Sequence, residues 1–306
     1  MSPQSKSMNA NEWSLLVFLS ILWGGAFFAA GVAVKEVPPL TVVLARVGLA
    51  AIILLPVFCY YGLKLPRSLK EWGPFIGMGI LNNILPFGFF FAGQTFISVG
   101  LASIINAMTP LFTVLVMASF REEALTPSRL VGVLLGAIGV GVIQSDGSTL
   151  EWTQTLGVIL CLCGAGSYGF AALWGRRFLS GVPPVKSATC QLLSSTALML
   201  VLASIIDRPW TLDAPSHSII WALIALAVFG TALAYIVFFE ILVRAGASNV
   251  MLVTLLIPIS AMILGTLFLN ETVVATQITG ALIIGLGLLF IDGRMFKCFK
   301  SLHRAR

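Results

Sequence analysis

The feature that most constrains this sequence is a succession of apolar stretches, each about twenty residues long, that fills nearly its whole length. The hydrocarbon layer of a bilayer is about 30 Å thick, and a helix needs about 20 predominantly apolar residues to cross it. The stretches lie at approximately residues 13–34, 39–61, 74–95, 97–119, 127–144, 155–174, 184–206, 218–240, 245–269 and 273–291. The connections are short, so we expect an all-α integral membrane protein with ten transmembrane helices.

The composition argues against a water-soluble domain. Hydrophobic residues make up 58% of the 306 residues and charged residues 10%, whereas a typical soluble domain carries about 25% charged residues. The net charge of +6 gives no reason to expect a nucleic-acid partner, because the positive residues lie in short loops. Four cysteines lie inside apolar stretches, where they are expected to pack rather than to bind metal, so we expect no cofactor: Cys59, Cys161, Cys163 and Cys190.

The positive charges predict the orientation. With a cytoplasmic N-terminus, all but three of the 18 lysines and arginines fall in cytoplasmic segments. The exceptions are Lys35 and Arg208 in outer loops and Arg46 within a helix. Because positive residues concentrate on the cytoplasmic side of membrane proteins, we expect both termini to be cytoplasmic, with residues 293–306 as a basic cytoplasmic tail. The expected location is the plasma membrane, which is the inner membrane in a bacterium.

The two halves of the sequence match each other. Matching residues recur 148 positions apart, among them Pro110 and Pro258, Glu123 and Glu271, Gly132 and Gly280, and Gly139 and Gly287. Nearer the start the offset is 145, which aligns Trp23 with Tyr168. Each half holds five stretches, so the second copy enters the membrane upside down. We expect inverted repeats at 13–144 and 152–292, an arrangement typical of secondary transporters, although a duplicated bundle without transport function is an alternative.

Several motifs resemble those of a known family. They are residues 22–25 (LWGG), Arg46 followed by Ala50 and Ala51, residues 100–103 (GLAS) ahead of 109–112 (TPLF), and Glu123. Over residues 13–292 the sequence resembles the drug/metabolite transporter superfamily, EamA type, and is most similar to the YddG-type exporters of aromatic and other neutral amino acids. The second half keeps Pro258 and residues 270–272 but has Tyr168 for the tryptophan and Gln191 for the arginine. The resemblance implies ten helices with both termini inside and export activity.

Three prolines near the middle of their stretches suggest a polar site. Each follows a polar residue by four positions: Pro86 follows Asn82, Pro110 follows Asn106, and Pro258 follows Thr254. A proline has no N–H, so the carbonyl four residues earlier loses its helical partner. Such breaks are tolerated at membrane depth only where protein or water satisfies the freed group. We expect either a polar substrate-binding patch or a set of kinks satisfied by their own side chains.

Aromatic and charged residues add to this candidate site. Trp23, Tyr168 and Tyr235 lie at midspan, although such residues usually prefer the membrane interface. We expect them to line one central cavity with the polar residues, or else to pack between helices. Arg46 is either an attractor for a substrate carboxylate or a structural lock on backbone carbonyls.

The carboxylates are expected to lie outside the centre of the spans. Glu240 precedes Arg244 by four positions, which suits an ion pair better than a gating or proton-coupling role. Glu123 and Glu271 stand near expected helix starts, where the helix dipole favours a carboxylate.

This inventory predicts a function. No Asp or Glu lies centrally in any stretch and no His lies in one. We expect a facilitative secondary transporter or exporter of small neutral or zwitterionic metabolites, favouring aromatic or bulky neutral amino acids, that works by alternating access. The alternatives are a proton-coupled exporter of drugs or other metabolites, a channel, and an intramembrane enzyme, for which no histidine base is available. The expected partners are a small-molecule substrate and membrane lipid, and the chain is expected to act as a monomer or weak homodimer.

Overall fold

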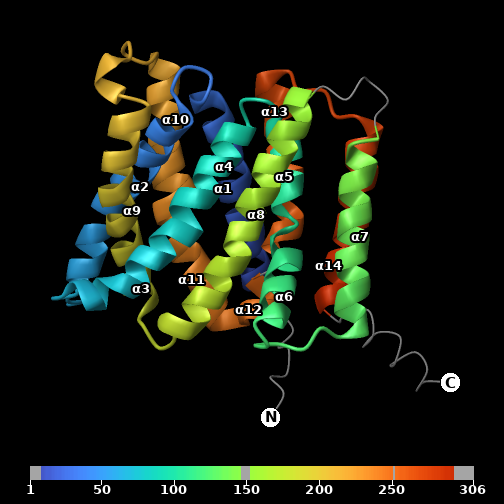
Figure 1. Cartoon of the computed structure of the whole chain (residues 1–306), viewed down its shortest axis with the longest axis horizontal. Helices are drawn as coiled ribbons and strands as arrows, with labels where there is room; N and C mark the ends of the chain where they lie inside the picture. Colours follow the sequence, from blue (N-terminus) through green and yellow to red (C-terminus); the bar gives the residue numbers. More distant parts are fainter. Residues whose placement is uncertain (1–7, 146–151, 251, 293–306) are drawn as a thin grey trace.

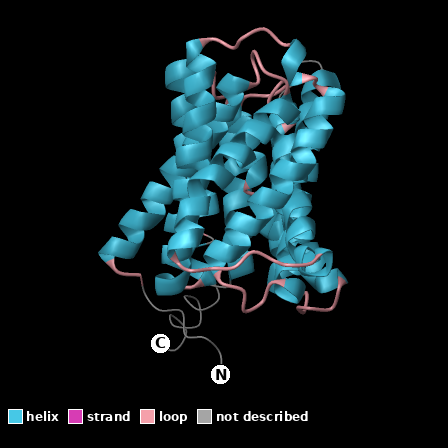
Figure 2. Cartoon of the chain, turned by 90° about the vertical axis from the view of Figure 1, so that its left-hand side faces the viewer, coloured by secondary structure: helices cyan, strands magenta, loops and turns pink. Residues whose placement is uncertain are grey.

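The computed structural model describes residues 8–145, 152–250 and 252–292. All regular elements in these residues are helices, which Figures 1 and 2 show gathered side by side in one bundle. The start of α1 and the end of α14 lie at the same end, at the bottom of Figure 1, which we call the lower end. The opposite end is the upper end. The expected basic tail at 293–306 lies outside the described residues.

The helices follow the expected stretches closely. The first half contains α1 (Ala10–Ala33), α2 (Pro39–Tyr60), α3 (Leu69–Gly79), the π-helix η1 (Ile80–Ile84), α4 (Leu85–Gly93), α5 (Val99–Asn106), α6 (Thr109–Ser119) and α7 (Pro127–Ile143). The second contains α8 (Trp152–Phe178), α9 (Pro184–Ile206), the 3₁₀ turn η2 (Pro209–Thr211), α10 (His217–Ala227), the π-helix η3 (Val228–Leu233), α11 (Ala234–Ala245), α12 (Ala247–Val250), α13 (Val253–Leu269) and α14 (Ala275–Asp292).

Most of these segments are long enough to cross a membrane. Within the described residues, seven segments satisfy both length and apolarity: 10–33, 39–60, 69–93, 99–119, 152–178, 184–206 and 217–245. Three further apolar helices have at most 17 residues, namely Pro127–Ile143, Val253–Leu269 and Ala275–Ile291. Seventeen helical residues span about 25 Å, which is the short limit for a spanning helix. The chain is thus a multi-pass membrane protein, and the number of ten spans stays a prediction.

Helices from opposite halves pack in pairs, α7 against α14, α2 against α9, and α1 against α13. Glycines bring α7 and α14 into backbone contact. A Cβ atom added to Gly132 would lie 2.6 Å from the carbonyl oxygen of Gly287, and one added to Gly139 would lie 2.8 Å from that of Gly280. Small residues allow membrane helices to approach this closely. Because Gly132 aligns with Gly280 and Gly139 with Gly287, the two contacts are equivalent.

At the upper end, carboxylates cap helices of the opposite half. The two Glu271 oxygens accept hydrogen bonds from the backbone N–H groups of Val99 (2.7 Å) and Gly100 (3.2 Å) at the start of α5. Asp207 accepts from the N–H and hydroxyl of Thr41 in α2. Glu36 does the same for Ser216, ahead of α10. Carboxylates at helix starts satisfy backbone donors that have no helical partner.

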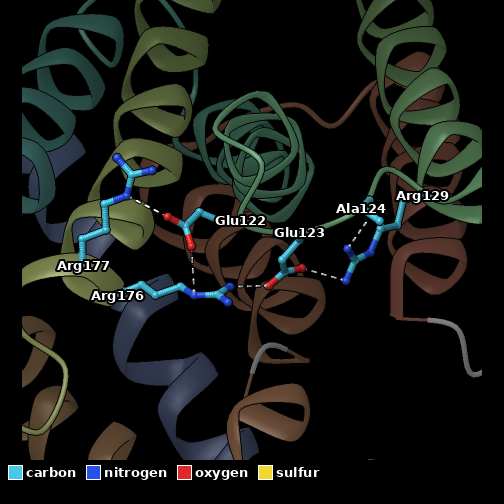
Figure 3. Close-up of polar contacts among 6 residues, drawn as sticks. All are labelled: Glu122, Glu123, Ala124, Arg129, Arg176 and Arg177. Atoms are coloured by element: carbon cyan, nitrogen blue, oxygen red, sulfur yellow. Dashed lines mark hydrogen bonds and ion pairs between the residues drawn. The ribbon is translucent and has the colours of Figure 1, made fainter.

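At the lower end, carboxylates pair with arginines instead (Figure 3). Glu122 lies 2.7 Å from Arg177, and Glu123 lies 3.1 Å from Arg176 and 2.8 Å from Arg129. These pairs tie the loop between α6 and α7 to the end of α8. The structure thus gives Glu123 guanidinium partners, and the helix-dipole interpretation of this residue stays a prediction. For Glu271 the helix concerned is α5 and not the helix that follows it in sequence.

Candidate functional site

Regular α-helix is interrupted in the middle of the bundle at two of the three predicted prolines. Before Pro86 the chain forms the π-helix η1, which contains Asn82. Before Pro110, α5 ends at Asn106 and a turn formed by Ala107 and Met108 precedes α6. In both cases the proline cannot donate to the carbonyl four residues earlier, so the preceding backbone leaves the α-helical pattern.

The third proline behaves differently. Pro258 lies inside the continuous helix α13. The boundary between two helices comes earlier, where α12 ends at Val250 and α13 begins at Val253. A helix can continue through a proline when only one backbone hydrogen bond is lost and neighbouring protein satisfies the freed group. Thr254 therefore lies in the first turn of α13, a helix that packs against α1 and α5.

The second π-helix, η3, was not predicted because residues 228–233 contain no proline. It is the counterpart of η1 at the offset of 148. Arg46 of α2 stabilises it by donating from Nε to the Thr231 hydroxyl (2.9 Å) and from Nη2 to the Gly230 carbonyl (3.2 Å). Arg46 thus bonds to a backbone carbonyl at Gly230, and its role stays a prediction.

We call the contacts of Arg46 with η3 a clamp, and an equivalent clamp holds η1. Gln191 of α9 aligns with Arg46 at the offset of 145, and its side-chain oxygen accepts a hydrogen bond from Asn82 (3.2 Å). Ser195, one turn further along, accepts from the Asn83 amide (2.9 Å) and donates to the Gly79 carbonyl (3.2 Å). Each half thus uses its second long helix to hold the π-helix of the other half. One clamp is cationic and the other is neutral.

Aromatic rings surround the two clamps. The guanidinium carbon of Arg46 lies 3.7 Å from the centre of the Phe87 ring, a cation–π geometry. Tyr235, the counterpart of Phe87 at the offset of 148, donates from its hydroxyl to the Asn83 side-chain oxygen (3.3 Å). The Tyr168 ring stacks on Phe90, with 6.3 Å between ring centres.

The structure brings some of the predicted site residues together. Arg46, Asn82 and Tyr235 belong to the clamps or contact them directly. Trp23 reaches Tyr235 through a chain of rings formed by Phe238 and Phe239. Asn106 makes no side-chain hydrogen bond to another described residue, and its grouping with the others stays a prediction, as does that of Thr254. Sequence reasoning missed Asn83, Thr231 and Ser195. The signal for the first two was their alignment at the offset of 148, and Ser195 had none.

Charge is scarce in this region. Arg46 is the one buried charged residue among those described, and none of the described carboxylates is buried. Glu240 is paired with Arg244 through its Oε1 atom, 2.6 Å from Nε, in an exposed position near the lower end. The predicted ion pair is thus formed. Within the described ranges, no three His, Cys, Asp or Glu side chains cluster as metal ligands would.

A cavity of about 480 Å³ lies between α1, α10 and η3. Its lining is almost wholly apolar and includes Ile21, Phe28, Trp221 and Phe229. None of the six predicted substrate-binding residues lines it. Because Ile21, Trp221 and Phe229 are also exposed on the outside of the bundle, this cavity opens toward the lipid. Its lining also includes Gly230, whose carbonyl accepts a hydrogen bond from Arg46.

Comparisons with known proteins show similar proteins over nearly the whole chain. The model of the EamA-like transporter family matches residues 12–145 and again residues 155–292. An uncharacterised transporter of Archaeoglobus fulgidus is 25% identical over 285 residues, covering 92% of this chain and 98% of that protein. A probable amino-acid metabolite efflux pump of Escherichia coli is 25% identical over 294 residues, covering 92% and 94%. A crystal structure with 20% identity superposes with a TM-score of 0.64, covering 93% of this chain and 97% of that one, and shows the same fold.

Proposed function

Because the chain belongs to the EamA-like transporter family, we propose that it is a secondary transporter that exports small neutral or zwitterionic metabolites, favouring aromatic or bulky neutral amino acids. The observation that carries this proposal is the chemistry of the clamp region. It combines one buried cation, neutral amides and several aromatic rings, without a buried carboxylate among the described residues. The relative described as a probable amino-acid metabolite efflux pump supports the same substrate class.

The topology proposed with this function has ten spans in two inverted five-helix repeats, at 13–144 and 152–292, with both termini in the cytoplasm. The loop charges support it, and so does the double match of the family model. In this arrangement the lower end of the bundle is cytoplasmic and the upper end external. The membrane would be the plasma membrane, and the inner one in a bacterium.

We propose that the described conformation is closed at the external end. The support is the unequal use of two equivalent residues. Glu271 holds the start of α5 at the upper end, where α5 packs against α13. At the lower end Glu123 binds arginines instead. In an alternating-access cycle, Glu271 would release α5 when the external end opens.

Facilitated movement down a gradient is favoured over proton coupling. A proton-coupled carrier generally needs a titratable group buried near the middle of the membrane, whereas Glu240 is ion-paired and about half exposed. The test is flux of phenylalanine and methionine in proteoliposomes, with and without a pH gradient or membrane potential. We expect saturable flux down the amino-acid gradient in every condition. Concentrative uptake that appears only with a proton gradient would favour the proton-coupled exporter.

The polar residues of the site are tested in the same assay. Asn82→Ala removes the hydrogen bond to Gln191, and Asn106→Ala removes the amide at the end of α5. We expect each variant to reduce flux at unchanged expression. Thr279→Ala on the exposed face of α14 is the control, since its hydroxyl bonds only to its own helix at Ala275. Normal kinetics in both asparagine variants would remove the polar-patch hypothesis.

A further inference from the structure

We propose that Arg46, together with the hydroxyl groups of Tyr168 and Tyr235, forms the seat for a substrate carboxylate. The transporter would therefore select solutes that carry an anionic group at one end. This inference rests on the proposed function and adds to it the chemical group that the site requires. The three side chains come from α2, α8 and α11, so both halves of the chain contribute.

The first argument is the missing counter-charge. Arg46 is only 7% exposed, and the described ion pairs involve other arginines. A buried cation without an anionic partner is costly. A guanidinium has five N–H donors, and the hydrogen bonds to Thr231 and Gly230 use two of them. A substrate carboxylate would supply both the missing charge and acceptors for the remaining donors.

The second argument comes from the other half of the chain. Gln191 occupies the equivalent position and holds η1 through a neutral amide. Holding a π-helix therefore does not require a positive charge. The charge of Arg46 exceeds what its structural contact with η3 needs. A role in binding an anion accounts for that excess, whereas a purely structural role does not.

The third argument is the setting of the two phenols. Tyr168 and Tyr235 interact electrostatically with the charge of Arg46. Tyr235 donates a long hydrogen bond of 3.3 Å to Asn83, and a phenol hydroxyl can donate to a carboxylate instead. Phe87 lies beneath the guanidinium and Phe90 beside Tyr168. These rings supply the apolar surface that an aromatic or bulky solute would contact.

The test compares solutes that differ at one group. Purified protein in proteoliposomes is offered labelled phenylalanine, 3-phenylpropionate, which keeps only the carboxylate, and phenylalaninol, which lacks it. We expect wild-type flux of the two carboxylates to exceed that of phenylalaninol by about tenfold or more, since a site built to bind a group rejects analogues that lack it. Equal flux of all three solutes would overturn the inference and leave the transport function intact. Absence of flux for all three, and for methionine, would overturn the proposed function itself.

Variants test whether Arg46 provides the preference for carboxylates. Arg46→Gln installs the residue that the second half uses and should abolish the preference for carboxylates while phenylalaninol still moves. Arg46→Lys should keep most of the preference for carboxylates. If Arg46→Gln does not fold, Thr231→Val provides the second readout. It removes one acceptor of the clamp but leaves the charge, so flux should slow while the preference remains. Loss of the preference in Thr231→Val, or its full retention in Arg46→Gln, would contradict the assignment.

Discussion

Two contacts join equivalent parts of the two halves: α7 packs against α14, and α5 packs against α13. Only the first of these contacts is symmetric in its details. In α7 and α14, the approach of Gly132 to Gly287 is repeated by that of Gly139 to Gly280. At α5, Glu271 binds backbone N–H groups, whereas its counterpart Glu123 binds arginines. We interpret the symmetric contacts as a framework common to all conformations and the asymmetric ones as belonging to one conformation.

The largest expected effect concerns the framework. Gly132→Val and Gly280→Val each place side-chain atoms against a backbone carbonyl of the partner helix. Overpacking of this kind costs about 1–3 kcal/mol, and the two variants should lose similar stability because their sites are equivalent. Thermal unfolding in detergent measures the loss. Gly141→Val on α7 is the matched control, since nothing lies within 4 Å of a Cβ at that position. Clearly unequal losses would break the symmetry on which the comparison rests.

A smaller effect is expected at the asymmetric contact. Glu271→Ala removes the cap of α5 and should cost about 1–2 kcal/mol, as loss of a helix cap does. Glu123→Ala should cost less, about 0–1 kcal/mol, because its ion pairs are partly exposed to solvent. Hydrogen exchange should become faster in α5 only for Glu271→Ala. If both variants behaved alike, the carboxylates would have equal roles and the external closure would lose its support.

The smallest effect concerns another cap at the upper end. The pKa of Glu36 lies below its usual value of 4.5 because its carboxylate accepts hydrogen bonds from the backbone N–H and hydroxyl of Ser216. A lowered pKa in the folded state means that this contribution is complete above the unfolded pKa and is lost as the pH falls through the folded value. We expect a slight additional loss of melting temperature below about pH 4.5 in wild type that Glu36→Gln lacks. An identical pH profile in both proteins would show that this exposed cap contributes nothing.

The sequence predicted the helices well because apolar length is a local property. It also located the breaks at Asn82 and Asn106, because each is marked by a proline. It missed η3, where no proline stands and the Gly230 carbonyl bonds to Arg46 from a distant helix. The pairing of Asn82 with Gln191 was hidden for the same reason. Contacts between the halves depend on how the repeats cross, and no local pattern encodes that geometry.

The bond from Arg46 to Thr231 joins residues 185 positions apart, which has a consequence for biosynthesis. At a translation rate of about 5–20 residues per second, the ribosome reaches Thr231 about 10–40 s after it has made Arg46. During that interval α2 enters the bilayer with a cation whose partners do not yet exist, at an insertion cost of about 2.5–3.5 kcal/mol. The first half of the chain is therefore an incomplete intermediate, and the nascent second half completes it by delivering oxygen atoms that accept hydrogen bonds from Arg46.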